Sequence, residues 1–111
     1  MPDVTTDPSL FEFTKNKNNK VTIVRYLGNE KRVVIPETLD GGTVKVLGVY
    51  SFGGKSELQE VFMPDCIETV RGMTFGECAN LKKVHLYERL TEIVKSTFDG
   101  CVALAFIRVK S

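Results

Sequence analysis

The sequence of 111 residues has no tryptophan, a single histidine, an odd number of cysteines and no excess of either charge. Its 15 Lys and Arg residues are balanced by 14 Asp and Glu residues and form no basic block, which argues against a nucleic-acid partner. No apolar run approaches the roughly 18 residues that cross a bilayer, and residues 1–10 lack the basic start and apolar core of a signal peptide. We therefore expect neither a membrane span nor nucleic-acid binding.

The scarcity of histidine also bears on catalysis. Only His85 could serve a Ser–His–Asp or Cys–His mechanism, and no motif supports one. It stands between Val84 and Leu86, which are expected to point inward from a strand, so alternation predicts a solvated position on the outer side. The pairs Gly41-Gly42 and Gly53-Gly54 lack the Lys-Ser/Thr that follows in a phosphate-binding loop. We expect no catalytic residues, no enzyme activity and no cofactor.

Three cysteines give no even disulfide framework, so the sequence leaves the compartment open. Cys78 and Cys101 lie 23 residues apart, and in successive coils they would approach to about 5 Å, which a disulfide tolerates. We favour two stacked, buried thiols, because free cysteine packs well as a small hydrophobe. Cys66 stands elsewhere in its repeat, and none of the three has the short spacing of zinc ligands, so no metal site is expected.

One interval organises the sequence, because apolar residues recur 23 positions apart. Phe52, Phe75 and Phe98 keep this spacing around the stretch Met73 to Leu81. Further columns that share the interval are Leu58, Leu81 and Leu104; Val61, Val84 and Ile107; Leu47, Val70 and Ile93; and Val44, Ile67 and Leu90. A period of roughly 20 to 29 residues centred on leucine is typical of leucine-rich repeats. The pattern predicts a β-rich leucine-rich repeat solenoid, with short strands, short helical or irregular turns, and an interior phenylalanine column.

Three parts follow from this pattern. Residues 1–9 show no periodicity and carry two prolines, which predicts a flexible end without function. Residues 10–31 hold two β-type segments around the polar cluster Asn16 to Lys20, so we predict a β-hairpin that caps the first coil. Residues 32–111 contain about three repeats and end in an uncapped strand.

The unit L-x-x-V-x-M-P-x-x-I-x-x-V-x-x-x-T-F-x-x-C, from Leu58 to Cys78, resembles the BspA-like leucine-rich repeat family. Two units depart from it, since Tyr87 replaces the proline of the third and Lys55 the cysteine of the first. The resemblance implies a non-enzymatic protein-binding or adhesion module, with a host or extracellular-matrix protein as partner. It also implies a place at the cell surface, or secretion, if a leader was removed; the sequence alone leaves the location unknown.

Two columns of side chains are expected to point outward from adjacent strands. Arg32, Glu60, Lys83 and Phe106 form one, whose alternating charges predict cross-strand ion pairs; Val34, Phe62, His85 and Arg108 form the other. Aromatic rings beside arginine on an open sheet are typical of protein-binding patches, although a merely solvated sheet remains an alternative. We predict that a protein partner contacts Phe62, His85, Phe106 and Arg108, with Tyr87 at the margin.

The last strand suggests a second function. Leu104, Ile107 and Val109 belong to an edge that no coil covers, and exposed edges invite pairing. The alternative to a binding module is therefore a structural or self-assembly unit, either part of a longer array or a weak homo-oligomer formed through this edge.

Overall fold

The computed structural model describes residues 4–88, 90 and 92–110. Its strands are β1 (Phe11–Lys15), β2 (Lys20–Tyr26), β3 (Arg32–Val34), β4 (Thr38–Leu39), β5 (Gly42–Leu47), β6 (Glu60–Phe62), β7 (Thr69–Val70), β8 (Lys83–Tyr87), β9 (Glu92–Ile93) and β10 (Phe106–Lys110). The helical elements of this described part are two short 3₁₀ turns, η1 (Pro8–Leu10) and η2 (Lys95–Phe98).

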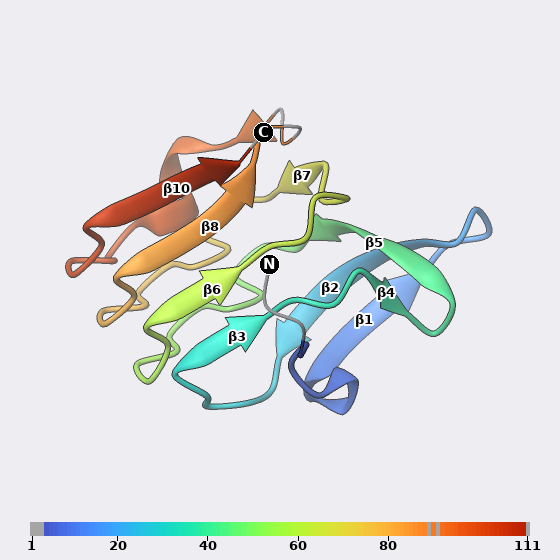
Figure 1. The fold of residues 1–111 in the computed structure, drawn as a ribbon, viewed down its shortest axis with the longest axis horizontal. Coiled ribbons are helices and arrows are strands. Elements are labelled where there is room, and N and C mark those ends of the chain that lie inside the picture. Colours follow the sequence, from blue (N-terminus) through green and yellow to red (C-terminus); the bar gives the residue numbers. More distant parts are fainter. Residues whose placement is uncertain (1–3, 89, 91, 111) are drawn as a thin grey trace.

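The strands form two sheets on opposite sides of the core (Figure 1). One sheet has the order β10-β8-β6-β3 and is parallel throughout. The other has the order β1-β2-β5-β7-β9, with β4 paired to β5, and its antiparallel pairs are β1–β2 and β4–β5. From β2 onward the chain alternates between the two sheets, except that β4 and β5 are consecutive strands of the same sheet. The predicted leucine-rich repeat solenoid, with a hairpin at its N-terminal side, is confirmed.

The strand register gives the 23-residue interval its physical meaning. Val61 pairs with Val84, and Val84 pairs with Ile107, so residues one period apart are direct neighbours in parallel strands. Strands β3 and β6 stay short because a proline stands two residues after the last residue of each. Proline has no N–H group to donate to a neighbouring strand. Successive coils therefore stack with their apolar columns aligned.

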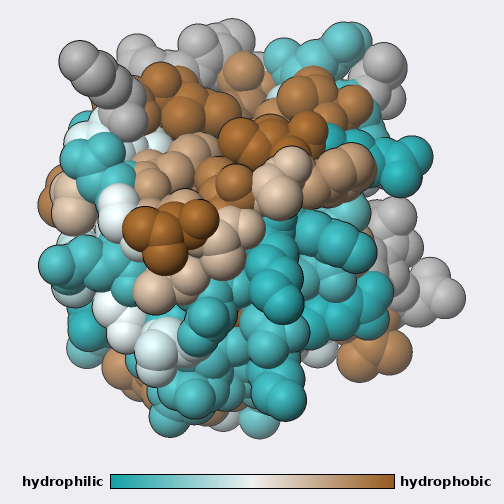
Figure 2. All heavy atoms as spheres, turned by 90° about the vertical axis from the view of Figure 1, so that its left-hand side faces the viewer, coloured by the Kyte–Doolittle hydropathy of each residue, from teal (hydrophilic) through white to brown (hydrophobic). Residues whose placement is uncertain are grey.

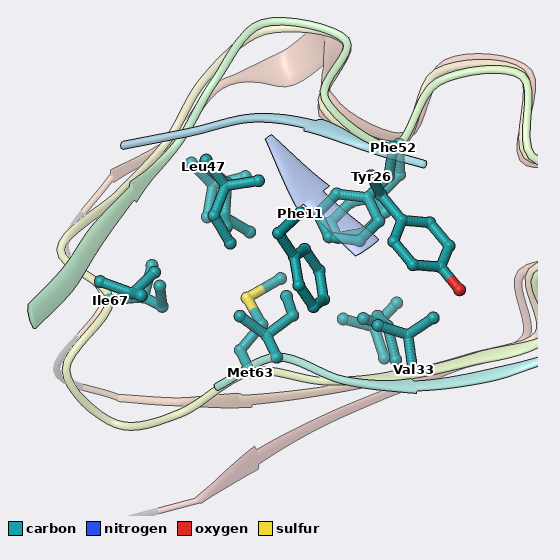
Figure 3. Packing of buried hydrophobic residues seen from close by; sticks show 14 of the residues in the cluster. Phe11, Tyr26, Val33, Leu47, Phe52, Met63 and Ile67 are labelled. Carbon is teal, nitrogen blue, oxygen red and sulfur yellow. The ribbon is translucent and has the colours of Figure 1, made fainter. Parts of the chain in front are cut away.

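An aromatic column runs through the core along the stacking direction. Ring centroids lie 5.1 Å apart for Phe52 and Phe75 and 5.6 Å apart for Phe75 and Phe98, as the sequence predicted. The column continues beyond the repeats, because Tyr26 lies 5.4 Å from Phe52 and Phe11 lies 5.4 Å from Tyr26. Figure 3 shows Phe11, Tyr26 and Phe52 gathered together, with Val33 and Met63 extending toward them from the sheet that contains β3 and β6.

The cysteines of the repeat act as stacked thiols. Cys78 Sγ donates to Phe52 O and Cys101 Sγ donates to Phe75 O, both at 3.0 Å, so each thiol bonds to the coil before its own. Both cysteines are free and stacked, as predicted from the sequence, but of the two only Cys78 is buried, whereas Cys101 is half-buried. Burial raises the pKa of the Cys78 thiol to about 11 and raises that of Cys101 as well.

The N-terminal end of the stack is closed by two elements. Strand β1 extends one sheet beyond β2, and Phe11 on it is buried. On the other sheet, Thr6 N donates to Val34 O at 3.0 Å, and Val34 N donates to Thr6 Oγ1 at 2.8 Å. Residues 1–9 were predicted to be a flexible end without function. Of these, Thr6 is buried and bonded to β3, and residues 1–3 lie outside the described residues.

The C-terminal end is open. Lys110 O accepts from Glu88 N, so alternation turns the peptide groups of Ile107 and Val109 away from β8. Their side chains are 48% and 56% exposed, although they continue the buried columns of the earlier coils. Figure 2 looks onto this end, where apolar side chains form a band above a polar region. Leu104, also assigned to this edge from the sequence, is half-buried and packs against the core.

Candidate functional site

The outer side of the sheet β3-β6-β8-β10, here called the strand face, carries the residues predicted for partner binding. The register aligns Arg32, Glu60, Lys83 and Phe106 in one row, Val34, Phe62, His85 and Arg108 in the next, and Tyr87 with Lys110 in a third. Both predicted columns are therefore confirmed as neighbours. One member does not belong to the open surface: Val34 is only 5% exposed, because the segment around Thr6 covers it.

Two rings of the strand face are stacked on one another. The centroids of Phe62 and His85 lie 4.1 Å apart with an interplanar angle of 2°. The guanidinium of Arg32 lies 4.7 Å from the Phe62 centroid, which places a cation near that ring as well. Phe106 stands 6.2 Å from His85 at 60° and is 46% exposed. Parallel pairing in register brings these rings together, since each occupies the same or an adjacent row.

Glu60 connects the cation to the imidazole. Its Oε2 lies 2.7 Å from His85 Nε2, and its Oε1 lies 3.6 Å from Arg32 Nε. The alternating charges predicted that Glu60 pairs with Arg32 and with Lys83. The pair with Arg32 is present, but among the described side chains the second partner of Glu60 is His85, its diagonal neighbour. His85 was also predicted to be solvated, whereas its side chain is 17% exposed, because the Phe62 ring and Glu60 enclose it. The four side chains form a closed, mutually supporting group.

A pocket of about 110 Å³ opens at the C-terminal ends of the strands. It is lined by Phe62, His85, Tyr87, Arg108 and Lys110, together with the buried Met63 and Leu86. Four of the five residues predicted for partner binding line this one pocket, and Phe106 stands beside it against His85. The structure therefore brings the predicted group together.

A second hollow, of about 340 Å³, lies at the N-terminal ends of the same strands. It is lined by Lys31, Arg32, Gln59, Glu60, Lys82 and Lys83. Its position follows from the ladder, since Lys82 N donates to Gln59 O and Gln59 N donates to Lys31 O. The strand face thus has one small pocket and one wider basic groove, at opposite ends of its strands.

Some residues of this surface were not included in the sequence-based prediction. Lys110 repeats Tyr87 at the 23-residue interval, so the signal that placed Arg108 could have placed Lys110 too. The Glu60–His85 contact was missed because a strict cross-strand rule ignores diagonal neighbours. No group of three His, Cys, Asp or Glu residues in the described part of the chain could hold a metal ion. No helix in this part of the chain is long and apolar enough to span a membrane.

The family model described as BspA type Leucine rich repeat region (6 copies) matches residues 29–111. No curated protein matches the chain.

Several solved structures share the fold. A leucine rich repeat protein of T. pallidum aligns with a TM-score of 0.80 and 24% identity, over 94% of this chain and 49% of its own. A leucine rich cell surface protein of Faecalibacterium prausnitzii A2-165 aligns with a TM-score of 0.77 and 28% identity, over 98% of this chain and 32% of its own. A leucine-rich repeat protein of Bacteroides capillosus ATCC 29799 aligns with a TM-score of 0.63 and 22% identity, over 96% of this chain and 99% of its own. The chain spans about half or less of the first two proteins.

Proposed function

The chain belongs to the BspA-type leucine-rich repeat family, and on this premise we propose that it is a non-enzymatic module that binds a protein partner through its strand face. The observation that carries the proposal is the pocket in which Phe62, His85 and Arg108 meet. Aromatic and arginine side chains around a shallow pocket are characteristic of residues that dominate binding energy at protein interfaces. The paired Arg32–Glu60–His85–Phe62 group holds the rings in place before binding, which lowers the entropy lost on association.

The partner and location that we propose are those of an adhesion module. The F. prausnitzii relative is described as a leucine rich cell surface protein, which supports a surface or secreted location for this chain too. A host or extracellular-matrix protein is then the class of partner that such a module would meet.

The experiment is a binding screen of the purified chain against immobilised extracellular-matrix proteins, with one double variant and one matched control. Phe62→Ser with Arg108→Glu should abolish binding of any partner found. Val24→Ser with Lys17→Glu makes the same chemical changes on exposed residues of the other sheet and its hairpin, and it should bind normally. Circular dichroism checks that both variants stay folded. Equal binding by wild type and by the Phe62/Arg108 variant would move the site away from the strand face.

A second candidate function is supported by the open end, where Ile107 and Val109 are about half exposed. Here the module would pair with a second copy of itself through β10, as apolar sheet edges do. Sedimentation velocity over a range of protein concentrations tests this. Ile107→Lys should remove a concentration-dependent increase in mass, whereas Val49→Lys, at an exposed valine outside the sheets, should leave it. A wild type that stays monomeric at high concentration would rule out this candidate.

A further inference from the structure

The strand face carries far more positive charge than the chain as a whole. The outward positions of its strands hold the cations Arg32, Lys83, Arg108 and Lys110 and the single carboxylate Glu60. Four cations against one carboxylate leave three positive charges here, with His85 counted as neutral, whereas the formal charge of the entire chain is +1. The remainder of the chain is therefore net negative, and the surface proposed to bind a partner is its basic side.

The one carboxylate of the strand face is already engaged. Glu60 uses one oxygen for His85 and the other for Arg32, so it is poorly placed to neutralise the remaining cations. Among the side chains that the structure describes, no carboxylate lies within ion-pair distance of Arg108 or Lys110. A ligand that brings its own negative charge would gain charge-assisted hydrogen bonds at these positions.

The cations are concentrated at the two ends of the strands. Arg108 and Lys110 line the small pocket, and Lys31, Lys82 and Lys83 line the wider groove. Strand β8 begins at Lys83 and ends at Tyr87. These two residues are four positions apart, and a rise of about 3.3 Å per residue places the two ends of the strand about 13 Å from one another. Between them lie the Phe62, His85 and Phe106 rings. Along the strand direction, an aromatic region therefore lies between two basic regions.

The orientation of the rings restricts what can bind between the charged ends. Phe62 and His85 cover one another at 4.1 Å, and Arg32 lies near the other side of Phe62. Both flat faces of Phe62 are thus covered, as is one face of His85, so a sugar ring or a nucleobase has no open face of Phe62 on which to stack. The ring edges remain. Their partial positive charge attracts carboxylates, and apolar side chains gain by burying apolar surface against them.

We propose that the strand face recognises an acidic peptide segment of its protein partner, bound extended with carboxylates at both ends of an apolar stretch. One carboxylate side chain enters the pocket between Arg108 and Lys110, and a second lies in the groove beside Lys82 and Lys83. The apolar residues between them lie against the ring edges. The pocket of about 110 Å³ admits a single side chain, which favours an extended segment over a folded element. This inference rests on the proposed function and specifies the chemistry of its partner.

The experiment selects peptides from a naive displayed library of 12-residue sequences on the wild-type chain. Enriched peptides are expected to carry two Asp or Glu residues separated by about three or four positions, the spacing that about 13 Å of extended chain requires. Fluorescence anisotropy then compares each enriched peptide with its Asn/Gln counterpart at physiological salt. Replacing one of the two carboxylates is expected to weaken binding by about tenfold.

Charge-reversal variants locate the contact. Arg108→Glu with Lys110→Glu should remove binding of the acidic peptides, whereas Arg71→Glu with Lys17→Glu changes one arginine and one lysine at exposed positions away from the strand face. Equal loss in both double variants would mean that the peptides respond only to net charge, and it would overturn the proposal.

Other results separate this inference from the proposed function. Enriched peptides without acidic residues, whose binding Phe62→Ser still removes, would overturn the acidic specificity and leave a protein-binding strand face. Peptides that bind equally well to the Phe62→Ser with Arg108→Glu variant would contradict both. Heparin is the probe for a sulfated polysaccharide; its binding at Arg108 and Lys110, together with no selected acidic peptide, would also overturn the proposal.

Discussion

The two ends of the stack contain the same kinds of residue in very different surroundings. Val61, Val84 and Ile107 occupy one column in register, yet the two valines are fully buried and Ile107 is 48% exposed. At the opposite end Phe11 of β1 packs against Tyr26, and Thr6 forms hydrogen bonds with the peptide group of Val34. The repeat thus determines which way a side chain points, and the next layer determines whether it is buried. Closure of the core is supplied by segments that do not repeat.

The largest expected difference between an inner layer and the open end lies in the phenylalanine column. Phe75 is fully buried between Phe52 and Phe98, whereas Phe98 is half-buried and, among the described residues, stacks on the Phe75 ring alone. Phe75→Ala should lower the free energy of unfolding by about 3 to 5 kcal/mol, and Phe98→Ala by clearly less. Urea titration measures both. Equal losses would mean that the last coil is packed as tightly as the middle one.

The buried thiol of Cys78 should make the stability of the inner coils depend on pH. The pKa of Cys78 is about 11 in the folded chain against an ordinary value of 9.0, so an unfolded chain loses this proton first as pH rises. The protonated thiol of Cys78 therefore contributes about 2 to 3 kcal/mol to the free energy of unfolding below pH 9, and this contribution is lost as the pH rises through 11. The Cys78→Ala variant should show a shallower decline of unfolding free energy over this range. Parallel profiles for wild type and variant would contradict the assignment.

Thr6 tests the closed end. Thr6→Ala removes the oxygen that accepts from the buried Val34 N–H, and an unsatisfied buried donor costs about 1 to 3 kcal/mol of stability. Thr6→Ser keeps the hydroxyl and should retain most of the stability. Thermal or urea unfolding compares the two variants, and amide hydrogen exchange at Val34 should accelerate in the alanine variant alone. Unchanged exchange would show that the segment contributes nothing to closure.

The smallest expected effect concerns a turn of the last coil. Gly100 and Gly41 both adopt left-handed backbone, with φ of 80° and 75°. A Cβ at Gly100 would lie 3.1 Å from the Glu77 backbone, whereas one at Gly41 would meet nothing within 4 Å. Gly100→Ala should therefore lower the free energy of unfolding by about 1 kcal/mol more than Gly41→Ala does. The Gly41→Ala variant serves as the control, because its effect comes from backbone strain alone. Matching losses would indicate that coils at the open end are loosely stacked.

The sequence alone predicted the contacts between residues that recur at the 23-residue interval. It placed Phe52, Phe75 and Phe98 in one column, and it placed Phe62 beside His85 and His85 beside Arg108. These predictions succeeded because parallel stacking turns a fixed sequence separation into direct contact.

Features outside the interval were missed. Tyr26 precedes Phe52 by 26 residues, so no regular spacing identified it as the next ring of the column. Thr6 lies in a segment without pattern, and its bond to Val34 depends on where the chain passes in space. The ring stack and the Glu60–His85 contact depend on side-chain rotamers, which a register cannot determine.

The Thr6 contact also restricts the symmetry of any assembly. A head-to-tail contact, in which β10 of one copy adds to β3 of the next, would need the outward peptide group of Val34, and Thr6 already occupies it. Such a contact would also generate an open filament, because each copy would leave another end free. Pairing of one β10 with another about a two-fold axis uses both open ends and closes at a dimer. If copies associate through β10, the two hydrogen bonds between Thr6 and Val34 therefore favour a closed dimer over an open filament.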